Sequence, residues 1–288
     1  MNIIDDKFDF ESYFVENQDE GAKVRPASQW CDEVIDRVFG QSAPTNWTPI
    51  LGLAIGMAQN GFVPMPEIQF LAYLHNAEDQ IRGEAATLSF FSNQQYRNPM
   101  VVRIAGLPYQ KGFGGHFHND NSLAVLTDIP GIIVAVPSCA ADAPAMLREC
   151  VRLAHEDGRV IIFVEPIALY HTTDLAEAGD GGWTANYTAP AEATPIALGE
   201  LGVHGAGKDL AIITYGNGYF LSRQAEPELR AKGIDLRIID LRWLHPLNET
   251  GIVEAVASAK KILVVDECRR AGSPSEKLVT ILAEAGRG

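Results

Sequence analysis

The sequence of 288 residues carries a formal net charge of −14, and 47% of it is hydrophobic. This apolar content is enough for a substantial core, so we expect a globular protein of one large or two ordinary domains. The acidic balance argues against nucleic acids and anionic membrane surfaces as partners, because phosphate groups select clustered lysine and arginine.

The four cysteines, Cys31, Cys139, Cys150 and Cys268, lie far apart. None has the close paired spacing of zinc or redox motifs, so we expect reduced thiols. The N-terminus lacks a basic segment followed by an apolar run, and no stretch of about 18 uninterrupted apolar residues occurs. These features predict a soluble cytoplasmic protein.

The first 48 residues are polar, and only "WCDEVIDRVF" (30–39) has helical spacing of apolar residues. A helix is expected to begin near Pro49, where Gly52 and Gly56 share one face and favour close packing or a subunit contact. A strand over 63–70 and a helix over 71–91 should follow.

Strands and helices then alternate, which is typical of a parallel α/β sheet. Strands are expected at 99–106, 131–138 and 159–166, and helices at 122–129 and 140–156. From His171 to about Pro195 the composition changes to Thr, Ala, Gly and Asp, as in a connecting segment.

Three further strands, at 209–217, 235–244 and 260–268, are separated by helical segments at 220–233 and 248–260. We therefore predict a first domain over 1–175, a linker over 176–195 and a smaller α/β domain over 196–288.

The loop "GFGGHFHND" (112–120) is the main candidate for chemistry, because it leaves the carboxyl end of a strand, where ligands collect in parallel sheets. Its glycines allow close approach to a ligand, and His116 and His118 project to one side if the segment is extended. A solvated loop with incidental histidines is the alternative. No carboxylate or cysteine with ligand spacing lies nearby, so we predict no metal here. Glu67 is a further candidate for a functional residue, because it lies at the start of an otherwise apolar strand segment.

Several segments together resemble the beta subunit of thiamine-diphosphate-dependent 2-oxo acid dehydrogenases, in that family's order, from about Arg37 to Thr280. They are "RVFG", "ILGLAIGMAQNGFVPMPEIQFLAYLHNAEDQIRGEAA", "PMVVRIAG", "GGHFHNDNSLAVL", "IPGIIVAVPS", "FVEPIALY", "IIDLRWLHPL" and "VVDECRRAG". The resemblance implies an α/β fold: a parallel-sheet pyrimidine-binding domain, divergent over 1–36, followed by a smaller transketolase C-terminal-like domain.

The resemblance further implies a thiamine diphosphate shared between subunits, with its diphosphate and magnesium on an alpha portion and its aminopyrimidine on this chain. Tyr73 falls where an aromatic residue packs on the pyrimidine, and Thr45 and Trp47 lie in the stretch that borders it. His118 falls where a catalytic histidine faces the substrate, with His116 supporting it. Imidazole suits that place because its ordinary pKa lies near neutrality.

Three features depart from the family pattern. The family has a glutamate five residues before the first glycine of the Gly52/Gly56 helix, where its carboxylate activates the pyrimidine. Here that residue is Trp47, and an indole has one donor and no acidic proton to exchange. The segment 1–36 and the end of the chain also differ, so the C-terminal domain looks shortened. The chain would then be a divergent copy or part of a longer fused polypeptide.

These observations predict the beta-type half of a 2-oxo acid dehydrogenase component, which decarboxylates a 2-oxo acid and transfers the acyl group to a lipoyl group. The alternative, motivated by Trp47, is a non-catalytic or cofactor-deficient assembly subunit. The implied partners are an alpha subunit or fused alpha domain, a lipoyl acyltransferase and further copies of the chain. The resemblance also implies a potassium ion near Cys150 and Asp157.

Overall fold

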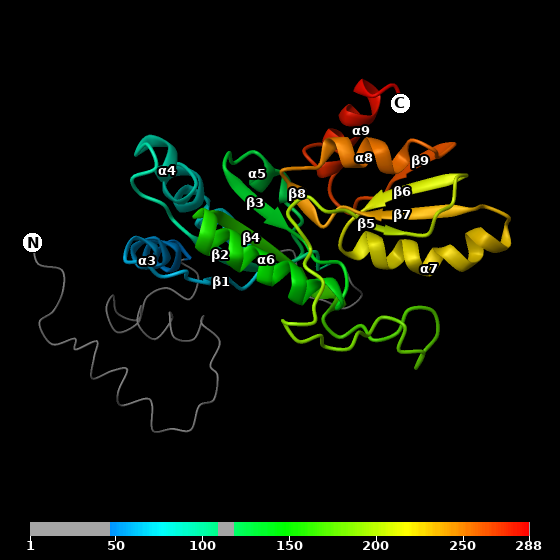
Figure 1. Ribbon diagram of the computed structural model, residues 1–288, viewed down its shortest axis with the longest axis horizontal. Coiled ribbons are helices and arrows are strands. Elements are labelled where there is room, and N and C mark those ends of the chain that lie inside the picture. The colour runs from blue at the N-terminus through cyan, green and yellow to red at the C-terminus, as the bar shows by residue number, and fades with distance from the viewer. Residues whose placement is uncertain (1–46, 109–117, 288) are drawn as a thin grey trace, which may run out of the picture.

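The computed structural model describes residues 47–108 and 118–287. Two sheets, each flanked by helices, form two lobes that lie side by side (Figure 1). The first sheet has the strand order β1-β2-β4-β3-β8 and the second has the order β5-β7-β6-β9. No helix among the described residues is long and apolar enough to span a bilayer.

The first lobe follows the alternation of strands and helices that the sequence predicts. Its elements are α3 (Thr48–Gln59), β1 (Glu67–Ile68), the 3₁₀ helix η1 (Leu71–Asn76), the π-helical turn η2 (Gln80–Ala85), α4 (Leu88–Phe91), β2 (Met100–Gly106), α5 (Leu123–Thr127), β3 (Ile132–Ala135), α6 (Asp142–Asp157), β4 (Val160–Pro166) and η3 (Ile167–Leu169). The strands β1, β2, β4 and β3 are parallel.

Side chains of the first sheet alternate between two apolar layers, as the two-residue period of a strand requires. Val101 and Ile161 pack with α6 residues such as Met146, whereas Val102 and Ile162 pack on the side of α3 and η1. Both faces are thus covered, which explains why these strands read as continuous apolar runs.

The second lobe is a smaller α/β unit, as predicted. It contains β5 (Gly202–His204), β6 (Leu210–Thr214), α7 (Asn217–Ala231), β7 (Leu236–Asp240), α8 (Glu249–Val256), β9 (Lys261–Val264) and α9 (Pro274–Glu284). The short strand β8 (Trp243–His245) lies between β7 and α8 in the chain but belongs to the first sheet. In Figure 1, α7 covers one face of this sheet, and α8 and α9 cover the other. One apolar cluster runs from the α3 side of the first lobe to α8 and α9.

The predicted single strand over 235–244 is wrong, because two strands form there and they join different sheets. β7 pairs with β6 in the second sheet, whereas β8 pairs antiparallel with β3 in the first. The chain changes direction between them at Arg242, whose φ of 58° lies in the left-handed region. The segment 235–244 mixes apolar and charged residues along its whole length, so the sequence carries no local mark of such a change of sheet.

The predicted continuous helix over 71–91 is also wrong. The segment forms a 3₁₀ helix, a π-helical turn and a short α-helix in succession. Leu71, Leu74 and Ala77 are all buried, and their three-residue spacing matches the three residues per turn of a 3₁₀ helix. This geometry places all three on the sheet and leaves Tyr73 half-buried at its side.

The glycines of α3 do not pack closely within the chain. Gly52 and Gly56 are exposed, and a Cβ added at either would meet nothing within 4 Å. Close packing inside the chain is therefore excluded for this face among the described residues. The subunit contact, the other reading of the pattern, stays a prediction.

No helix or strand forms between η3 and β5, in the part of the chain predicted as a linker. Its "GDGGW" motif forms a tight turn in which the Asp180 carboxylate accepts backbone hydrogen bonds from Leu175, Ala176, Glu177 and Gly182. The domain boundaries themselves stay a prediction.

Replacing Arg242 with alanine is expected to lower the free energy of unfolding by about 3 kcal/mol. The Arg242 Nε lies 2.8 Å from the Asp142 Oδ2 in α6, and both side chains are largely buried, so the variant leaves a buried carboxylate without its cation. Urea unfolding measures the change. Arg152→Ala is the control, because the ion pairs of Arg152 lie at the surface and should contribute little. Equal stabilities for Arg242→Ala and the unchanged chain would contradict this account.

Candidate active site at the carboxyl edge of the first sheet

Four aromatic rings, those of Trp47, Phe70, Tyr73 and His118, form an aromatic cluster beside the first sheet. The Tyr73 hydroxyl lies 3.2 Å from the His118 Nε2. The Phe70 and His118 ring centroids are 4.5 Å apart, and Phe70 meets the Tyr73 ring edge-on at 5.7 Å. The structure thus brings together three of the residues selected from the sequence, His118, Tyr73 and Trp47.

The 3₁₀ helix η1 holds the segment that follows His118 through a second contact. The His75 Nε2 lies 2.9 Å from the Asp120 Oδ2. Tyr73 and His75 are two residues apart on η1, and their partners His118 and Asp120 are also two residues apart. Burial alone would raise the pKa of the Asp120 carboxyl, but hydrogen bonds from Ser122 and His75 and the nearby charge of Arg269 lower it on balance. Asp120 is therefore an anion at neutral pH.

Trp47 lies directly on the cluster. Its ring stacks on Tyr73 with a centroid separation of 5.9 Å and an interplanar angle of 15°. The side chain is buried, at 7% exposed, and its indole N–H has no hydrogen-bond partner among the described residues. A buried donor without a partner is costly, so this N–H points to an acceptor that the described part of the chain does not supply.

Two other selected residues cannot be placed. Thr45 and His116 lie outside the described residues. Phe70, His75 and Asp120 were not selected from the sequence, although they complete the cluster and its support. The one available signal was the spacing of Phe70, Tyr73 and His75 in the same short segment.

Glu67 belongs to a half-buried ion-pair network across three neighbouring strands, β1, β2 and β4. The Arg103 Nη1 lies 3.3 Å from the Glu67 Oε2, and the Arg103 Nε lies 2.7 Å from the Glu165 Oε1. The Tyr170 hydroxyl donates to the other Glu165 oxygen at 2.6 Å. Arg103, Glu165 and Tyr170 border a cavity of about 650 Å³ that also reaches Trp183. Charged residues inside apolar strands were the sequence signal for this network.

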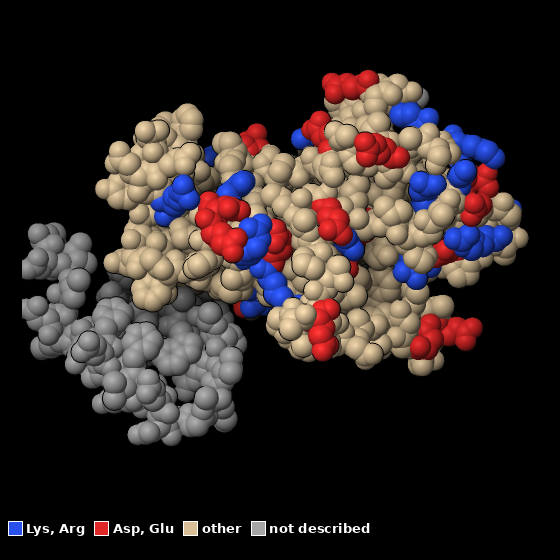
Figure 2. Space-filling view, in the orientation of Figure 1, with Lys and Arg blue, Asp and Glu red and all other residues tan. Residues whose placement is uncertain are grey.

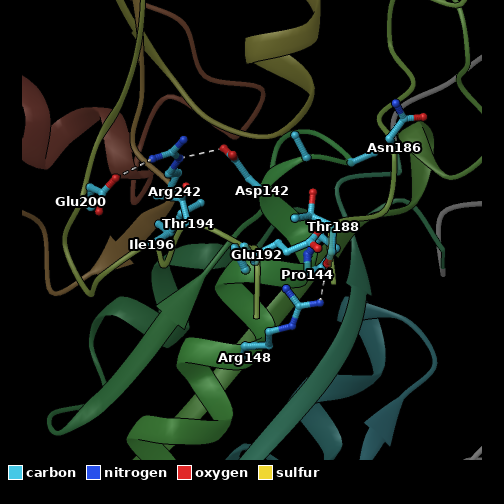
Figure 3. Close-up of a pocket in the computed structure, with 14 residues that line it drawn as sticks. Asp142, Pro144, Arg148, Asn186, Thr188, Glu192, Thr194, Ile196, Glu200 and Arg242 are labelled. Carbon is cyan, nitrogen blue, oxygen red and sulfur yellow. Dashed lines mark hydrogen bonds and ion pairs between the residues drawn. The ribbon is translucent and has the colours of Figure 1, made fainter. Parts of the chain in front are cut away.

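A separate pocket of about 390 Å³ lies between α6 and the segment 186–200 (Figure 3). Arg242 points toward Asp142 and Glu200, and Arg148 donates to the Thr188 carbonyl at 3.1 Å. Both guanidinium groups already have partners within the chain, so we interpret these contacts as holding the linker against the first lobe.

Two buried carboxyls lie where the lobes meet. Burial raises the pKa of Asp240 to about 7, although a hydrogen bond from Ser138 and the charge of Arg242 act in the other direction. Burial likewise raises the pKa of Glu267 to about 7, against a hydrogen bond from Asn217. Ser138 also accepts the Gly216 N–H at 2.7 Å, so these groups link the two sheets.

The described cysteines are free and at least half-buried. Burial raises the pKa of the Cys139 thiol to about 11 and that of Cys268 to about 12. They are therefore neutral thiols and poor nucleophiles at physiological pH.

Two family models match the chain. Residues 49–171 match the transketolase pyrimidine-binding domain, and residues 199–287 match the transketolase C-terminal domain. The 2-oxoisovalerate dehydrogenase subunit beta of Bacillus subtilis is 30% identical over 254 residues, which cover 88% of this chain and 70% of that protein. The chain belongs to the 2-oxo acid dehydrogenase beta-subunit family.

A second member of the family, the pyruvate dehydrogenase E1 component subunit beta of Bacillus subtilis, is 32% identical over 238 residues, with 82% of this chain and 66% of that protein covered. The chain therefore spans about two thirds of that relative. The solved structure "Split gene transketolase, inactive beta4 tetramer" has a TM-score of 0.63 at 20% identity and covers 87% of this chain and 73% of that chain. That likeness concerns the fold alone, and it agrees with the predicted transketolase-like α/β architecture.

Proposed function

We propose that the chain is the beta-type half of a thiamine-diphosphate-dependent 2-oxo acid dehydrogenase component. An alpha portion would hold the diphosphate and magnesium, and the acyl group formed by decarboxylation would pass to the lipoyl group of an acyltransferase. The observation that supports this best is the 3.2 Å contact between Tyr73 and His118, next to the strand edge at which parallel sheets bind ligands.

The aromatic cluster fits an aminopyrimidine in two respects and fails in one. The rings of Phe70 and Tyr73 suit its flat faces, and the Trp47 N–H, which has no acceptor among the described residues, suits a ring nitrogen. However, Trp47 covers one face of Tyr73 and supplies no carboxylate. We infer that the cluster can hold the cofactor and that its activation by this chain is weak. Bound thiamine diphosphate would supply the electron sink for loss of carbon dioxide.

His118 would act on the substrate side of the cluster. Its Nε2 shares a hydrogen bond with the Tyr73 hydroxyl, so a proton can be held on either atom, depending on the imidazole tautomer. Phe70 packs against the imidazole and limits its rotation. An imidazole held in this way can hydrogen-bond to charge that develops on the substrate.

A second candidate is an assembly subunit without catalysis, and Trp47 favours it. A ring that is buried and stacked on Tyr73 stabilises the fold by filling space, whether or not a cofactor binds. In that case the fold and the subunit surfaces would be retained, and no variant at Trp47 would restore turnover.

Exposed apolar residues support a partner on the first lobe. Phe90 is 81% exposed, Phe91 is 79% exposed, and Leu53, Met57 and Phe62 are also exposed. The end of the molecule that carries α4 is mostly uncharged in Figure 2. Apolar surface of this kind is typical of a protein interface, so we propose that the alpha portion or a further copy of the chain covers it.

The metal ions in this proposal are implied only by the family resemblance. Magnesium is assigned to the alpha portion, and no cluster of three potential ligands from His, Cys, Asp and Glu occurs among the described residues. The potassium ion near Cys150 and Asp157 stays a prediction. Burial raises the pKa of the Cys150 thiol well above its usual range, so its sulfur would contribute no charge.

The purified chain is expected to show no 2-oxo acid decarboxylation by itself, because the proposed diphosphate and magnesium site lies on the alpha portion. Mixing it with its alpha portion, thiamine diphosphate and magnesium should produce turnover, measured as carbon dioxide release from pyruvate and from branched-chain 2-oxo acids. A His118→Ala assembly is the control and should lose about 100-fold in kcat. Full activity of the chain alone would contradict the proposal.

A further inference from the structure

We propose that the loop 266–269 of the second lobe is a clamp that positions His118 from a distance. This inference rests on the proposed function, because it concerns the histidine assigned to the substrate. The clamp residues, Asp266, Glu267, Cys268 and Arg269, follow β9 and lie about 150 positions further along the chain than the residues they hold. They are positioning residues, because none touches the aromatic cluster in the described contacts.

The clamp holds the three residues Asp120, Asn121 and Ser122 through both backbone and side chains. The Cys268 Sγ donates to the Asn121 carbonyl at 3.0 Å, and the Asn121 amide reaches the Glu267 carbonyl at 3.5 Å. The Arg269 Nη2 donates to the Ser122 hydroxyl at 2.7 Å, and the Arg269 Nη1 lies 3.7 Å from the Asp120 Oδ1. Asn121 is buried, at 3% exposed, so its two contacts are largely shielded from water, whereas the Arg269 side chain is 66% exposed and holds Asp120 and Ser122 from the surface.

The held residues transmit this constraint to His118. Asp120 lies two positions after His118 and accepts a hydrogen bond from Ser122 on one carboxylate oxygen, while His75 meets the other. His75 and Tyr73 belong to the same 3₁₀ helix, and the Tyr73 hydroxyl reaches His118. A continuous series of contacts therefore links the clamp to Asp120, Asp120 to His75 on η1, and Tyr73 on η1 to the His118 imidazole.

The clamp is itself held firmly within the second lobe. The Asp266 carboxylate accepts hydrogen bonds from the Cys268 N–H at 2.9 Å, the Tyr215 hydroxyl at 2.7 Å and the Ser275 N–H at 3.0 Å. The Tyr215 hydroxyl and the Ser275 N–H reach this carboxylate from outside the clamp, so the loop cannot shift without breaking these bonds. A rigid support suits the positioning of a side chain whose placement matters within about 1 Å.

Arg269→Ala tests the clamp, with Arg270→Ala as the matched control. Arg270 is the next residue and is exposed, and it makes none of the clamp contacts. In the full chain, hydrogen–deuterium exchange of a peptide covering residues 118–122 should become about ten-fold faster in Arg269→Ala and stay unchanged in Arg270→Ala. Exchange in β4 should not change, which shows that the variant is folded. Cys268→Ala removes a different clamp contact and should act in the same direction.

The assembled enzyme provides the second readout. Arg269→Ala should lower kcat by about ten-fold and leave the KM for the 2-oxo acid within about two-fold, because the residue positions His118 and does not bind substrate. Arg269→Lys keeps the charge near Asp120 and should recover part of kcat.

Two results would overturn the clamp: exchange at 118–122 equal to that of the unchanged chain, or faster exchange with no change in kcat. If the unchanged assembly had no turnover, the proposed function would fail, whereas exchange in the chain alone would still support or reject the clamp.

Discussion

Replacing Trp47 with glutamate is expected to raise kcat of the assembled enzyme by about 100-fold. The family resemblance implies a carboxylate at this position to activate the aminopyrimidine, and an indole cannot exchange a proton there. The measurement is carbon dioxide release by the complex with the alpha portion at saturating thiamine diphosphate. The same variant should lower the free energy of unfolding by about 3 kcal/mol, because a buried ring that stacks on Tyr73 is lost.

Trp47→Gln is the matched control for this experiment. Glutamine has the size of glutamate and opens the same space beside Tyr73, but it carries no acid. It should therefore match the glutamate variant in stability and show none of the gain in kcat. An equal gain for both variants would mean that the presence of the indole ring, and not the lack of a carboxylate, limits turnover of the unchanged protein. No gain in either variant, from an assembly that forms normally, would favour the assembly subunit.

Stability is expected to fall as the pH rises from 5 to 8, by on the order of 2 kcal/mol or more. In the folded chain the pKa of Asp240 is about 7, well above its ordinary value of 3.8, because ionisation would place an unpaired charge in a fully buried site. The folded state thus holds a proton that the unfolded state releases. This contribution is fully present below about pH 4, is lost as the pH rises through 7, and stays lost above it.

Asp240→Asn should remove most of this pH dependence. Asparagine can keep the bonds that one Asp240 oxygen accepts from the Ser138 hydroxyl and the Arg242 N–H, and it does not ionise. The variant should gain stability over the unchanged chain at pH 8 and much less at pH 5, by urea unfolding at both values. Glu267→Gln should act in the same direction, because the pKa of Glu267 is also raised to about 7. The exposed control Asp79→Asn should leave the slope unchanged, and a slope equally steep in Asp240→Asn would assign the effect to other groups.

The sequence predicted the α/β alternation well because the parallel strands β2, β3, β4 and β6 are mostly buried and mostly apolar. The edge strand β9 is partly exposed, but three of its four residues are apolar, so it was expected too. The sequence could not show that residues 235–244 divide between two sheets, because the division depends on the left-handed conformation of one residue, Arg242, which no local pattern marks. The 3₁₀ helix η1 was missed because an apolar spacing of three also fits the first turns of an α-helix.

The site was predictable only in part, because its residues come from distant segments. Tyr73 and His118 were selected through the family resemblance, and their contact depends on how η1 meets the loop before α5. The positions of Arg269 and Cys268 beside Ser122 and Asn121 follow from the docking of the two lobes, and no local spacing encodes that docking. The same holds for Asp240, whose raised pKa arises from burial between the sheets.

The strand β8 has a consequence for how the chain folds during its synthesis. Residues 243–245 form the edge of the first sheet next to β3, although all its other strands end by residue 166. While the ribosome adds the next eighty residues or so, at about 5–20 residues per second, the nascent first lobe presents β3 with an open, apolar edge. We expect a nascent chain stalled near residue 200 to recruit chaperones and one stalled well beyond residue 245 to release them.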